Sequence, residues 1–269
     1  MAEGKFWIMR KFINKVLTHF DAEIVRKSLH QKLVQKQKQY ATYEMANLIG
    51  KENRAEYFAN IPNSRSQIFQ DFFALSVANF KKDGFFVEFG ATNGCHLSNT
   101  WLLEKHFGWG GILAEPAKKW HSDLCANRSA TIELDCVWST TGETLRFNEA
   151  DEDELSTIDV FSKGDQHSAA RQNGAIYDVQ TISLLDLLQK HSAPKLIDYL
   201  SIDTEGSEFE ILNAFDFNKY QFKCITVEHN FTPMRERIYD LLSQNGYSRV
   251  FSEFSRFDDW YTLESETAI

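Results

Sequence analysis

The feature that most constrains the fold is a change of sequence pattern at Gly84. From there on, short apolar runs alternate with longer segments of helical periodicity. This alternation predicts an α/β domain with a largely parallel sheet, because parallel strands need crossover connections that are usually helices. Strands are predicted at 85–89, 111–115, 130–137, 198–203 and 223–228, and helices at 97–106, 117–127, 181–191, 207–215 and 232–245. The runs 247–251 and 258–263 are predicted to be two further strands that give the sheet an antiparallel edge.

The segment before this domain is predicted to be helical over residues 5–40, because its apolar residues recur three and four positions apart. Residues 1–38 carry nine Lys or Arg and three Asp or Glu, although the whole chain has a net charge of −9. Two interpretations fit: an amphipathic helix that docks on an anionic membrane surface or a partner enzyme, and a helix that packs on its own main domain. Further helices are predicted at about 41–59 and 66–81.

Pro62 marks the predicted boundary between an N-terminal helical extension, residues 1–62, and the main domain, residues 63–269. The acidic charge of this main domain argues against nucleic acid as a partner. The longest uncharged stretch, 89–103, is fifteen residues and falls short of the roughly 20 apolar residues of a spanning helix. We therefore predict a cytoplasmic protein, with the inner face of a membrane as the alternative location.

Residues 84–100, GFFVEFGATNGCHLSNT, form the first candidate functional element. A predicted strand ends in Glu88, after which Gly90 and Gly94 turn the chain toward a helix. Glycines permit tight turns and a close approach of the backbone to a ligand. The spacing E-x-G-x-x-x-G differs from the G-x-G-x-x-G of dinucleotide sites and matches the pattern of S-adenosylmethionine (SAM) methyltransferases. The alternative is an ordinary strand-to-helix turn.

Glu115 ends the next predicted strand, in WGGILAEP. In open α/β sheets the ligand lies beyond the carboxyl ends of the strands, where an acid can accept hydrogen bonds from both hydroxyls of a ribose. The alternative is a surface acid before a proline turn.

The stretch YLSIDTEGSEFEIL, residues 199–212, is the most specific element. It delivers Asp203 to a strand end and places Glu205 and Glu208 at the start of a helix, where acids are favourable. The motif ID-x-EG-x-E-x-x-x-L, downstream of VEFGATNG, resembles the FkbM family of SAM-dependent O-methyltransferases. The resemblance covers about residues 66–261, including the SQxxQD motif at its start, the ELSTI loop and the closing FDDWY.

This resemblance implies a Rossmann-like, seven-stranded class I methyltransferase sheet with helices on both faces. It implies that Glu88, Gly90, Ala91 and Gly94 face the amino acid part of SAM and that Glu115 faces its ribose. Cys136, in the loop 135–138, would lie near the adenine, and Asp203 near the methyl group. Members of the family methylate hydroxyls, commonly of sugars in glycolipids, polysaccharides and natural products.

A fourth element, CITVEHNFTPMRERI, ends a strand in Glu228, His229 and Asn230. In the implied fold this strand neighbours the one that ends in Asp203, so their terminal groups should converge. His229 or Asp203 could act as general base toward a substrate hydroxyl. Alternatively, Asp203 and Glu228, together with His229 or Asn230, could bind a divalent cation such as Mg²⁺, Ca²⁺ or Mn²⁺. A third interpretation makes His229 purely structural.

The polar loop 151–173 is predicted to be a substrate lid, since loops of this length in compact domains are usually functional or disordered. Ser156, His167 and Arg171 are its candidate sugar or phosphate contacts, and Glu205 is a further candidate substrate residue. The alternative is a mobile surface loop.

The sequence therefore predicts a SAM-dependent O-methyltransferase acting on a hydroxyl of a sugar, a glycan or a glycan-derived metabolite. One alternative is an inactive methyltransferase-like module that recruits a partner through its basic N-terminal helices. Another is an NAD-dependent sugar oxidoreductase, for which the required G-x-G-x-x-G loop is absent.

Overall fold

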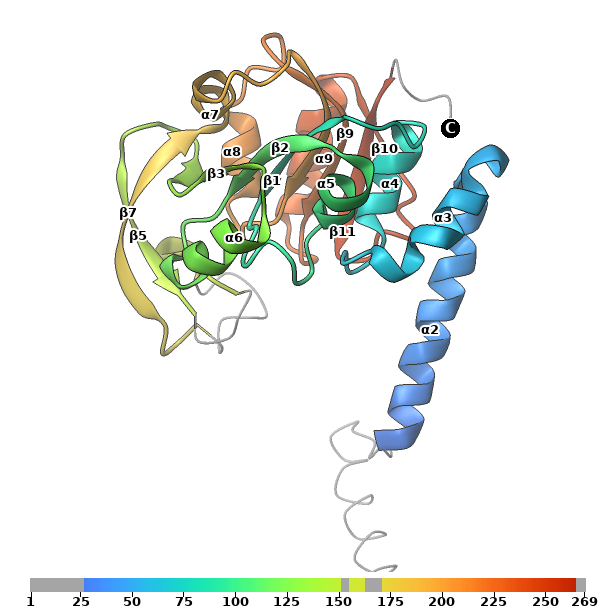
Figure 1. Cartoon of the computed structure of the whole chain (residues 1–269). Coiled ribbons are helices and arrows are strands. Elements are labelled where there is room, and N and C mark those ends of the chain that lie inside the picture. Colours follow the sequence, from blue (N-terminus) through green and yellow to red (C-terminus); the bar gives the residue numbers. More distant parts are fainter. Residues whose placement is uncertain (1–26, 151–154, 163–170, 265–269) are drawn as a thin grey trace, which may run out of the picture. The chain divides into compact units, whose positions relative to one another are not determined.

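The computed structural model describes residues 27–150, 155–162 and 171–264 (Figure 1). The chain divides into two compact units after Met45, within the long helix α2 (Lys27–Leu48). The break predicted near residue 40 is wrong, because α2 continues to Leu48 without interruption. The part of the predicted first helix before Lys27 lies outside the described residues. Within the described ranges, no helix is long and apolar enough to cross a membrane.

The second unit is built on a seven-stranded sheet with the order β10-β11-β9-β8-β1-β2-β3. All neighbouring strands pair in parallel except around β11, which is antiparallel to both β9 and β10. The predicted α/β class and the antiparallel edge are thus confirmed. The strands are β1 (Phe85–Phe89), β2 (Gly110–Ala114), β3 (Thr131–Glu133), β8 (Leu196–Ile202), β9 (Gln221–Glu228), β10 (Tyr247–Val250) and β11 (Asp258–Leu263).

The helices and 3₁₀ turns around this sheet match the predicted pattern but several begin later. They are η1 (Lys51–Asn53), α3 (Arg54–Asn60), η2 (Ile61–Asn63), α4 (Gln70–Val77), α5 (Trp101–Phe107), η3 (Lys118–Trp120), α6 (His121–Asn127), α7 (Leu184–Lys190), α8 (Glu208–Asn213) and α9 (Met234–Gln244). Helix α4 begins at Gln70 and not at residue 66 for a local reason. The hydroxyls of Ser64 and Ser66 donate to the Asp71 carboxylate at 2.6 and 2.7 Å. These bonds hold residues 64–69 in a non-helical loop.

A second, four-stranded sheet with the order β4-β7-β5-β6 was not predicted. Its strands are β4 (Cys136–Trp138), β5 (Thr144–Glu149), β6 (Thr157–Ile158) and β7 (Ala175–Ser183), and Figure 1 shows β5 and β7 side by side. The single strand predicted at 130–137 is wrong: its two halves belong to different sheets. The chain bends at Leu134 and Asp135, whose amides both donate to the Glu133 carboxylate at 3.1 and 3.3 Å.

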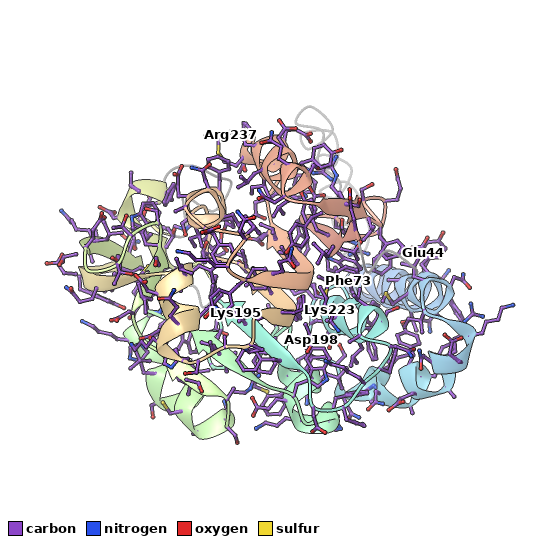
Figure 2. All side chains as sticks on the ribbon, turned by 90° about the horizontal axis from the view of Figure 1, so that it is seen from above. Glu44, Phe73, Lys195, Asp198, Lys223 and Arg237 are labelled. Atoms are coloured by element: carbon purple, nitrogen blue, oxygen red, sulfur yellow. The ribbon has the colours of Figure 1, made fainter. Side chains whose placement is uncertain are left out.

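At the amino edge of the main sheet, Asp198 on β8 ties three elements together (Figure 2). Its carboxylate pairs with Lys81 at 2.7 Å and Lys223 at 3.3 Å, and accepts the amide of Phe85 at 2.9 Å. These contacts fix the starts of β1 and β9 relative to β8. The chemistry-bearing residues predicted from sequence lie at the opposite, carboxyl edge of the same strands.

Candidate active site

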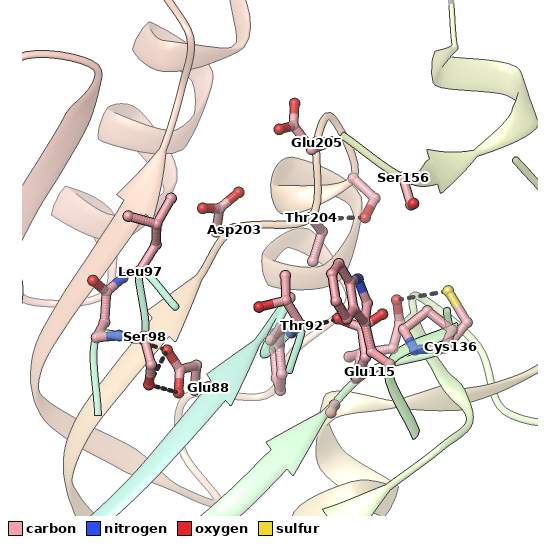
Figure 3. Close-up of a pocket in the computed structure, with 18 of the residues that line it drawn as sticks. Glu88, Thr92, Leu97, Ser98, Glu115, Cys136, Ser156, Asp203, Thr204 and Glu205 are labelled. Atoms are coloured by element: carbon pink, nitrogen blue, oxygen red, sulfur yellow. Dashed lines mark hydrogen bonds between the residues drawn. The ribbon is translucent and has the colours of Figure 1, made fainter. Parts of the chain in front are cut away.

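A cavity opens at the carboxyl ends of β1, β2 and β8, and its empty space, including the open mouth, is about 870 Å³ (Figure 3). Seven of the predicted site residues line it: Glu88, Gly90, Glu115, Cys136, Ser156, Asp203 and Glu205. The structure thus brings together residues that are separated by more than a hundred positions in the chain.

Gly90 sits where the ends of β1 and β8 come closest. Its φ is +73°, and a Cβ atom at this position would lie 1.9 Å from the backbone oxygen of Asp203. The amide of Gly90 donates to the oxygen of Ala114 at the end of β2, at 3.1 Å. Because only glycine fits here, Gly90 sets the distance between the predicted cofactor loop and Asp203.

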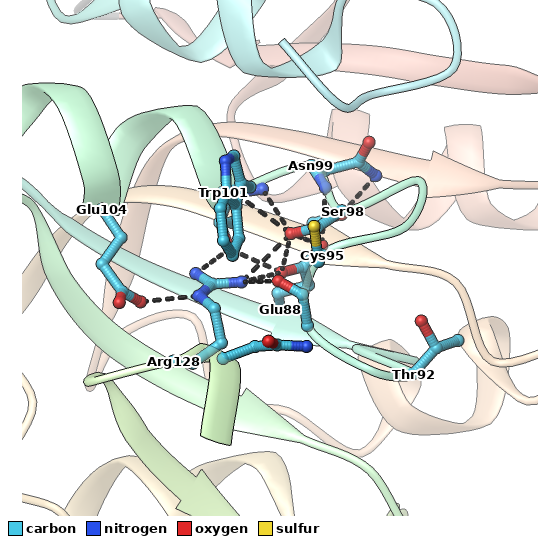
Figure 4. A network of polar contacts seen from close by, with 12 residues as sticks. Glu88, Thr92, Cys95, Ser98, Asn99, Trp101, Glu104 and Arg128 are labelled. Carbon is cyan, nitrogen blue, oxygen red and sulfur yellow. Dashed lines mark hydrogen bonds and ion pairs between the residues drawn. The ribbon is translucent and has the colours of Figure 1, made fainter. Parts of the chain in front are cut away.

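Glu88 is buried at the floor of the cavity and is surrounded by donors (Figure 4). Its carboxylate accepts hydrogen bonds from the backbone amide of Asn99 at 2.7 Å and from the hydroxyls of Thr100 and Ser98 at 2.5 and 3.1 Å. Burial raises the pKa of Glu88, while the nearby Arg128 and these donors oppose the rise. These contacts keep residues 98–100 irregular, which is why α5 begins at Trp101 and not at residue 97.

Arg128 is a buried cation behind the same loop, and no sequence pattern had singled it out. Its guanidinium donates to Glu104 at 2.7 Å, to the backbone oxygen of Gly94 at 3.0 Å and to the hydroxyls of Ser98 and Thr100 at 3.1 and 2.8 Å. It therefore ties the loop after β1 to α5 (Figure 4).

Gly94 serves this packing and does not line the cavity. A Cβ atom at Gly94 would lie 2.6 Å from Cγ of Arg128 and 2.7 Å from Cδ1 of Leu124. Ala91 is buried and is likewise absent from the cavity wall. The structure thus places both residues behind the cavity, where they shape the loop.

Glu115 is buried at the end of β2, and each of its carboxylate oxygens accepts one backbone amide. The donors are Thr92 at 2.7 Å and Ala117 at 2.8 Å. Burial is the main reason why the pKa of Glu115 rises to about 7, and the nearby Glu149 raises it further. Each carboxylate oxygen has a second lone pair, so the group can still accept hydrogen bonds from a ligand in the cavity.

The wall beyond Glu115 is mainly apolar and comes partly from the unpredicted second sheet. Cys136 and Val137 on β4, Phe147 on β5 and Trp120 on η3 line it. Burial raises the pKa of the Cys136 thiol to about 12, so this group is neutral. Such a surface suits a flat aromatic base better than a charged group.

Asp203, Glu205 and Glu228 form an acidic cluster at the ends of β8 and β9. One carboxylate oxygen from each lies within 4.8 Å of the others. Glu205 also pairs with Arg171 at 2.8 Å, and the Asn230 amide nitrogen donates to Glu228 at 2.8 Å. Burial and the neighbouring Asp203 and Glu205 raise the pKa of Glu228 well above its usual range. The third carboxylate of this cluster is thus Glu205, beside the predicted pair Asp203 and Glu228.

His229 does not line this cavity. Its Nδ1 accepts the backbone amide of Phe231 at 3.0 Å, and its Nε2 lies 3.8 Å from a carboxylate oxygen of Asp259. The ring is buried, and burial lowers its pKa. Of the two predicted bases, Asp203 therefore lies in this cavity and His229 does not.

Among the described residues of the predicted lid, Ser156 and Ile158 line the cavity, and the Ser156 hydroxyl accepts a hydrogen bond from the backbone amide of Ala150 at 3.1 Å. Arg171 is buried and donates to the Leu155 oxygen at 2.6 Å as well as to Glu205, so it holds the lid segment to the acidic cluster. His167 lies outside the described residues. Gln67, from the SQxxQD motif, also lines the cavity, a role that the sequence did not predict.

Comparison with known proteins decides the family. The profile of the methyltransferase FkbM domain matches residues 88–249. The chain belongs to the FkbM methyltransferase family. The resemblance predicted from the motifs is thereby confirmed, and this FkbM methyltransferase contains the predicted Rossmann-like sheet. No curated protein matches its sequence significantly.

Two solved methyltransferases are similar to this FkbM methyltransferase at low sequence identity. An FkbM methyltransferase from Methylobacillus flagellatus is 13% identical, with 84% of this chain and 59% of that chain covered and a TM-score of 0.44. A precorrin-6y C5,15-methyltransferase from Geobacter metallireducens is 10% identical, with 71% and 84% covered and a TM-score of 0.37. This chain thus spans less than two thirds of the length of the Methylobacillus flagellatus protein.

Proposed function

We propose that this methyltransferase binds SAM in the cavity and transfers its methyl group to a hydroxyl of a sugar, a glycan or a glycan-derived metabolite. The observation that carries the proposal is the pairing of two acids in one cavity, Glu115 at the end of β2 and Asp203 at the end of β8. Glu115 is available to a ribose, and Asp203 belongs to the acidic cluster. The sugar class of acceptor rests on the family resemblance.

The residues present fit SAM. Glu115 would accept the ribose hydroxyls, and the wall of Trp120, Cys136 and Phe147 would hold the adenine. Gly90 lines the cavity between the two acids, where it would lie beside the amino acid part of the cofactor. SAM supplies an electrophilic methyl group on a cationic sulfur, and the carboxylates of the acidic cluster favour a cation nearby.

Asp203 is best placed to remove the hydroxyl proton of the acceptor. As the oxygen forms its bond to the methyl carbon, the carbon–sulfur bond breaks and its electron pair stays on sulfur, while the proton passes to Asp203. A positioned general base contributes roughly 10²- to 10⁴-fold to such a step. Alignment of the oxygen with the methyl group contributes further, because the cavity holds both reactants in one geometry.

The Glu115→Gln variant tests the cofactor site. Glutamine keeps the size of the side chain but has no charge. Its NH₂ group faces one of the two backbone amides that donate to Glu115 in the wild type, so that hydrogen bond is lost. We expect SAM to bind about 10- to 100-fold more weakly, the effect of one hydrogen bond to a charged group. Isothermal titration of both proteins with SAM, S-adenosylhomocysteine and NAD⁺ measures this. Wild-type protein that binds NAD⁺ but not SAM would contradict the proposal and favour the oxidoreductase alternative.

SAM affinity should also depend on pH. The pKa of Glu115 is about 7 in the protein without cofactor, and ribose hydroxyls favour the ionised form, so binding lowers this pKa and releases a proton. Affinity is therefore full above about pH 7 and falls as the pH drops below it, approaching roughly tenfold per pH unit. Titrations between pH 5.5 and 8.5 measure the change. Glu115→Gln removes the titrating group and should flatten the profile, whereas an equal slope in both proteins would assign the effect to other groups.

A divalent cation is a second candidate for activating the hydroxyl, and the convergence of three carboxylates within 4.8 Å favours it. Asp203, Glu205 and Glu228 would hold Mg²⁺, Ca²⁺ or Mn²⁺ through oxygen, the donor these ions prefer. EDTA-treated protein distinguishes the candidates. Full activity without metal would support Asp203 acting alone, whereas lost activity restored by Mg²⁺ would support the cation. Melting temperatures test the cation without an activity assay. A rise in melting temperature with Mn²⁺ that Glu228→Gln abolishes would also support cation binding by the acidic cluster.

Two predictions remain open for experiment. A non-enzymatic module would bind SAM without turnover, so product formation separates it from the proposed enzyme.

The basic charge of residues 1–38 predicts a contact with a membrane or a partner enzyme, and a location at the inner face of a membrane. Both stay predictions.

A further inference from the structure

A second cavity adjoins the first at Glu205, which lines both. Its empty space, including the open mouth, is about 920 Å³, and it lies between the end of β9 and the starts of α8 and α9. Carboxylates line one part of it: Glu205, Glu208, Glu210 and Glu228. Apolar side chains line another: Phe161, Phe209, Pro233 and Met234. None of the roles assigned above uses this apolar surface.

Phe161 is a fixed part of this wall. It packs against the backbone of Gly206, where φ is +123° and a Cβ atom would lie 3.1 Å from Cβ of Phe161. Its ring also contacts Trp138, with ring centroids 6.0 Å apart. Because Gly206 directly follows Glu205, the aromatic surface stands next to the acid that the two cavities share.

The second cavity is lined by more acidic than basic side chains. Four glutamates line it beside one exposed arginine, Arg237 on α9 (Figure 2). Arg171 pairs with Glu205 at 2.8 Å, and burial and the neighbouring acids raise the pKa of Glu228, so Glu208 and Glu210 supply the excess negative charge. The guanidinium of Arg237 lies 3.8 Å from the ring centroid of Phe209 and donates to the sulfur of Met234 at 3.4 Å. His229, which also lines the cavity, adds no positive charge in its neutral form. An anion that entered would therefore approach several carboxylates and few cations.

We propose that the second cavity binds the methyl acceptor and selects a ring-bearing hydroxyl compound without negative charge. The proposal rests on the proposed function and deepens it. The apolar face of a sugar ring or of its aglycone packs on Phe161 and Phe209, while its hydroxyls reach the carboxylates beside Asp203. An acceptor with a carboxylate or phosphate is disfavoured, because like charges placed opposite each other cost binding energy.

Two matched probes test the charge selection: phenyl β-D-glucoside and phenyl β-D-glucuronide, which differ only at the sugar C6. Isothermal titration of the full chain saturated with S-adenosylhomocysteine is expected to give binding of the glucoside at least about tenfold tighter than that of the glucuronide. Glu210→Gln removes one of the negative charges of the second cavity and should narrow this ratio. A glucuronide that binds as tightly as the glucoside, or tighter, would overturn the proposal.

Cavity-filling variants test the location. Met234→Trp is expected to lower glucoside affinity at least about tenfold while the affinity for S-adenosylhomocysteine stays unchanged, because Met234 lines only the second cavity. Thr232→Trp, on the same wall, provides an independent variant if Met234→Trp lowers the melting temperature. Glucoside binding that neither variant affects, or no glucoside binding at all, would overturn the acceptor site alone. Wild-type protein that binds neither SAM nor S-adenosylhomocysteine would instead overturn the proposed function, and the acceptor site with it.

Discussion

The Asp203→Asn variant is expected to lose about 100- to 10,000-fold in kcat for methyl transfer, while SAM affinity changes less than about tenfold. Asparagine has nearly the same shape as aspartate but cannot take up the hydroxyl proton. The contact between Gly90 and Asp203 involves the backbone oxygen of Asp203, so the substitution leaves it in place. Transfer of labelled methyl from SAM to phenyl β-D-glucoside measures kcat, and isothermal titration measures SAM affinity.

The control for this prediction is Asp240→Asn, which removes an exposed carboxylate from α9 and should leave kcat unchanged. Thermal unfolding of both variants separates chemistry from folding. Undiminished transfer by Asp203→Asn would exclude Asp203 as the base. A large fall in melting temperature would instead show that Asp203 has a structural role.

The position of Asp203 could be predicted because its signal is local. The apolar residues of β8 are followed directly by an acid and a helix start, and parallel strands all end at the same sheet edge. The same reasoning placed Glu88, Gly90 and Glu115 at the cavity. What each acid contacts there could not be predicted, because the donors to Glu88 come from a loop whose path depends on Arg128.

The second sheet could not be predicted for a different reason. β5 pairs with β7 across a long polar segment, with Thr144 opposite Gln180 and Glu149 opposite Ala175. Such pairing leaves no periodic signal when strand residues are polar and half exposed, as in TLRFNE. The helix predicted at 181–191 begins only at Leu184, for a related reason. Ile182 and Ser183 pair with β4, and the Ser183 hydroxyl then caps α7 by accepting a hydrogen bond from the Asp186 amide at 3.1 Å.

Arg128 is the clearest case of a residue whose role only the fold reveals. In sequence it follows a short helix within NRS, a context that favours an exposed side chain. In the structure it is buried, because Glu88 from β1 and Glu104 from α5 both reach it. The three charges are far apart in the chain, and no local pattern couples them.

The Arg128→Met variant is therefore expected to lower the free energy of unfolding by about 3–5 kcal/mol, the cost of leaving a buried carboxylate without its cation. Methionine retains much of the apolar stem but none of the donors to Gly94, Ser98 and Thr100. Because these bonds shape the cofactor loop, SAM affinity should fall as well. Urea unfolding measures the stability, and titration at a temperature where the variant is folded measures the affinity.

The double variant Glu88→Gln with Arg128→Met separates charge from packing. Removing the charge of Glu88 should restore part of the lost stability, because the carboxylate no longer needs a cation, while Gln can still accept one of the bonds from residues 98–100. SAM affinity should remain low in the double variant, since Arg128 no longer holds the oxygen of Gly94. A loss below about 1 kcal/mol in Arg128→Met alone would contradict the argument and show that Glu88 takes up a proton in the fold at little cost.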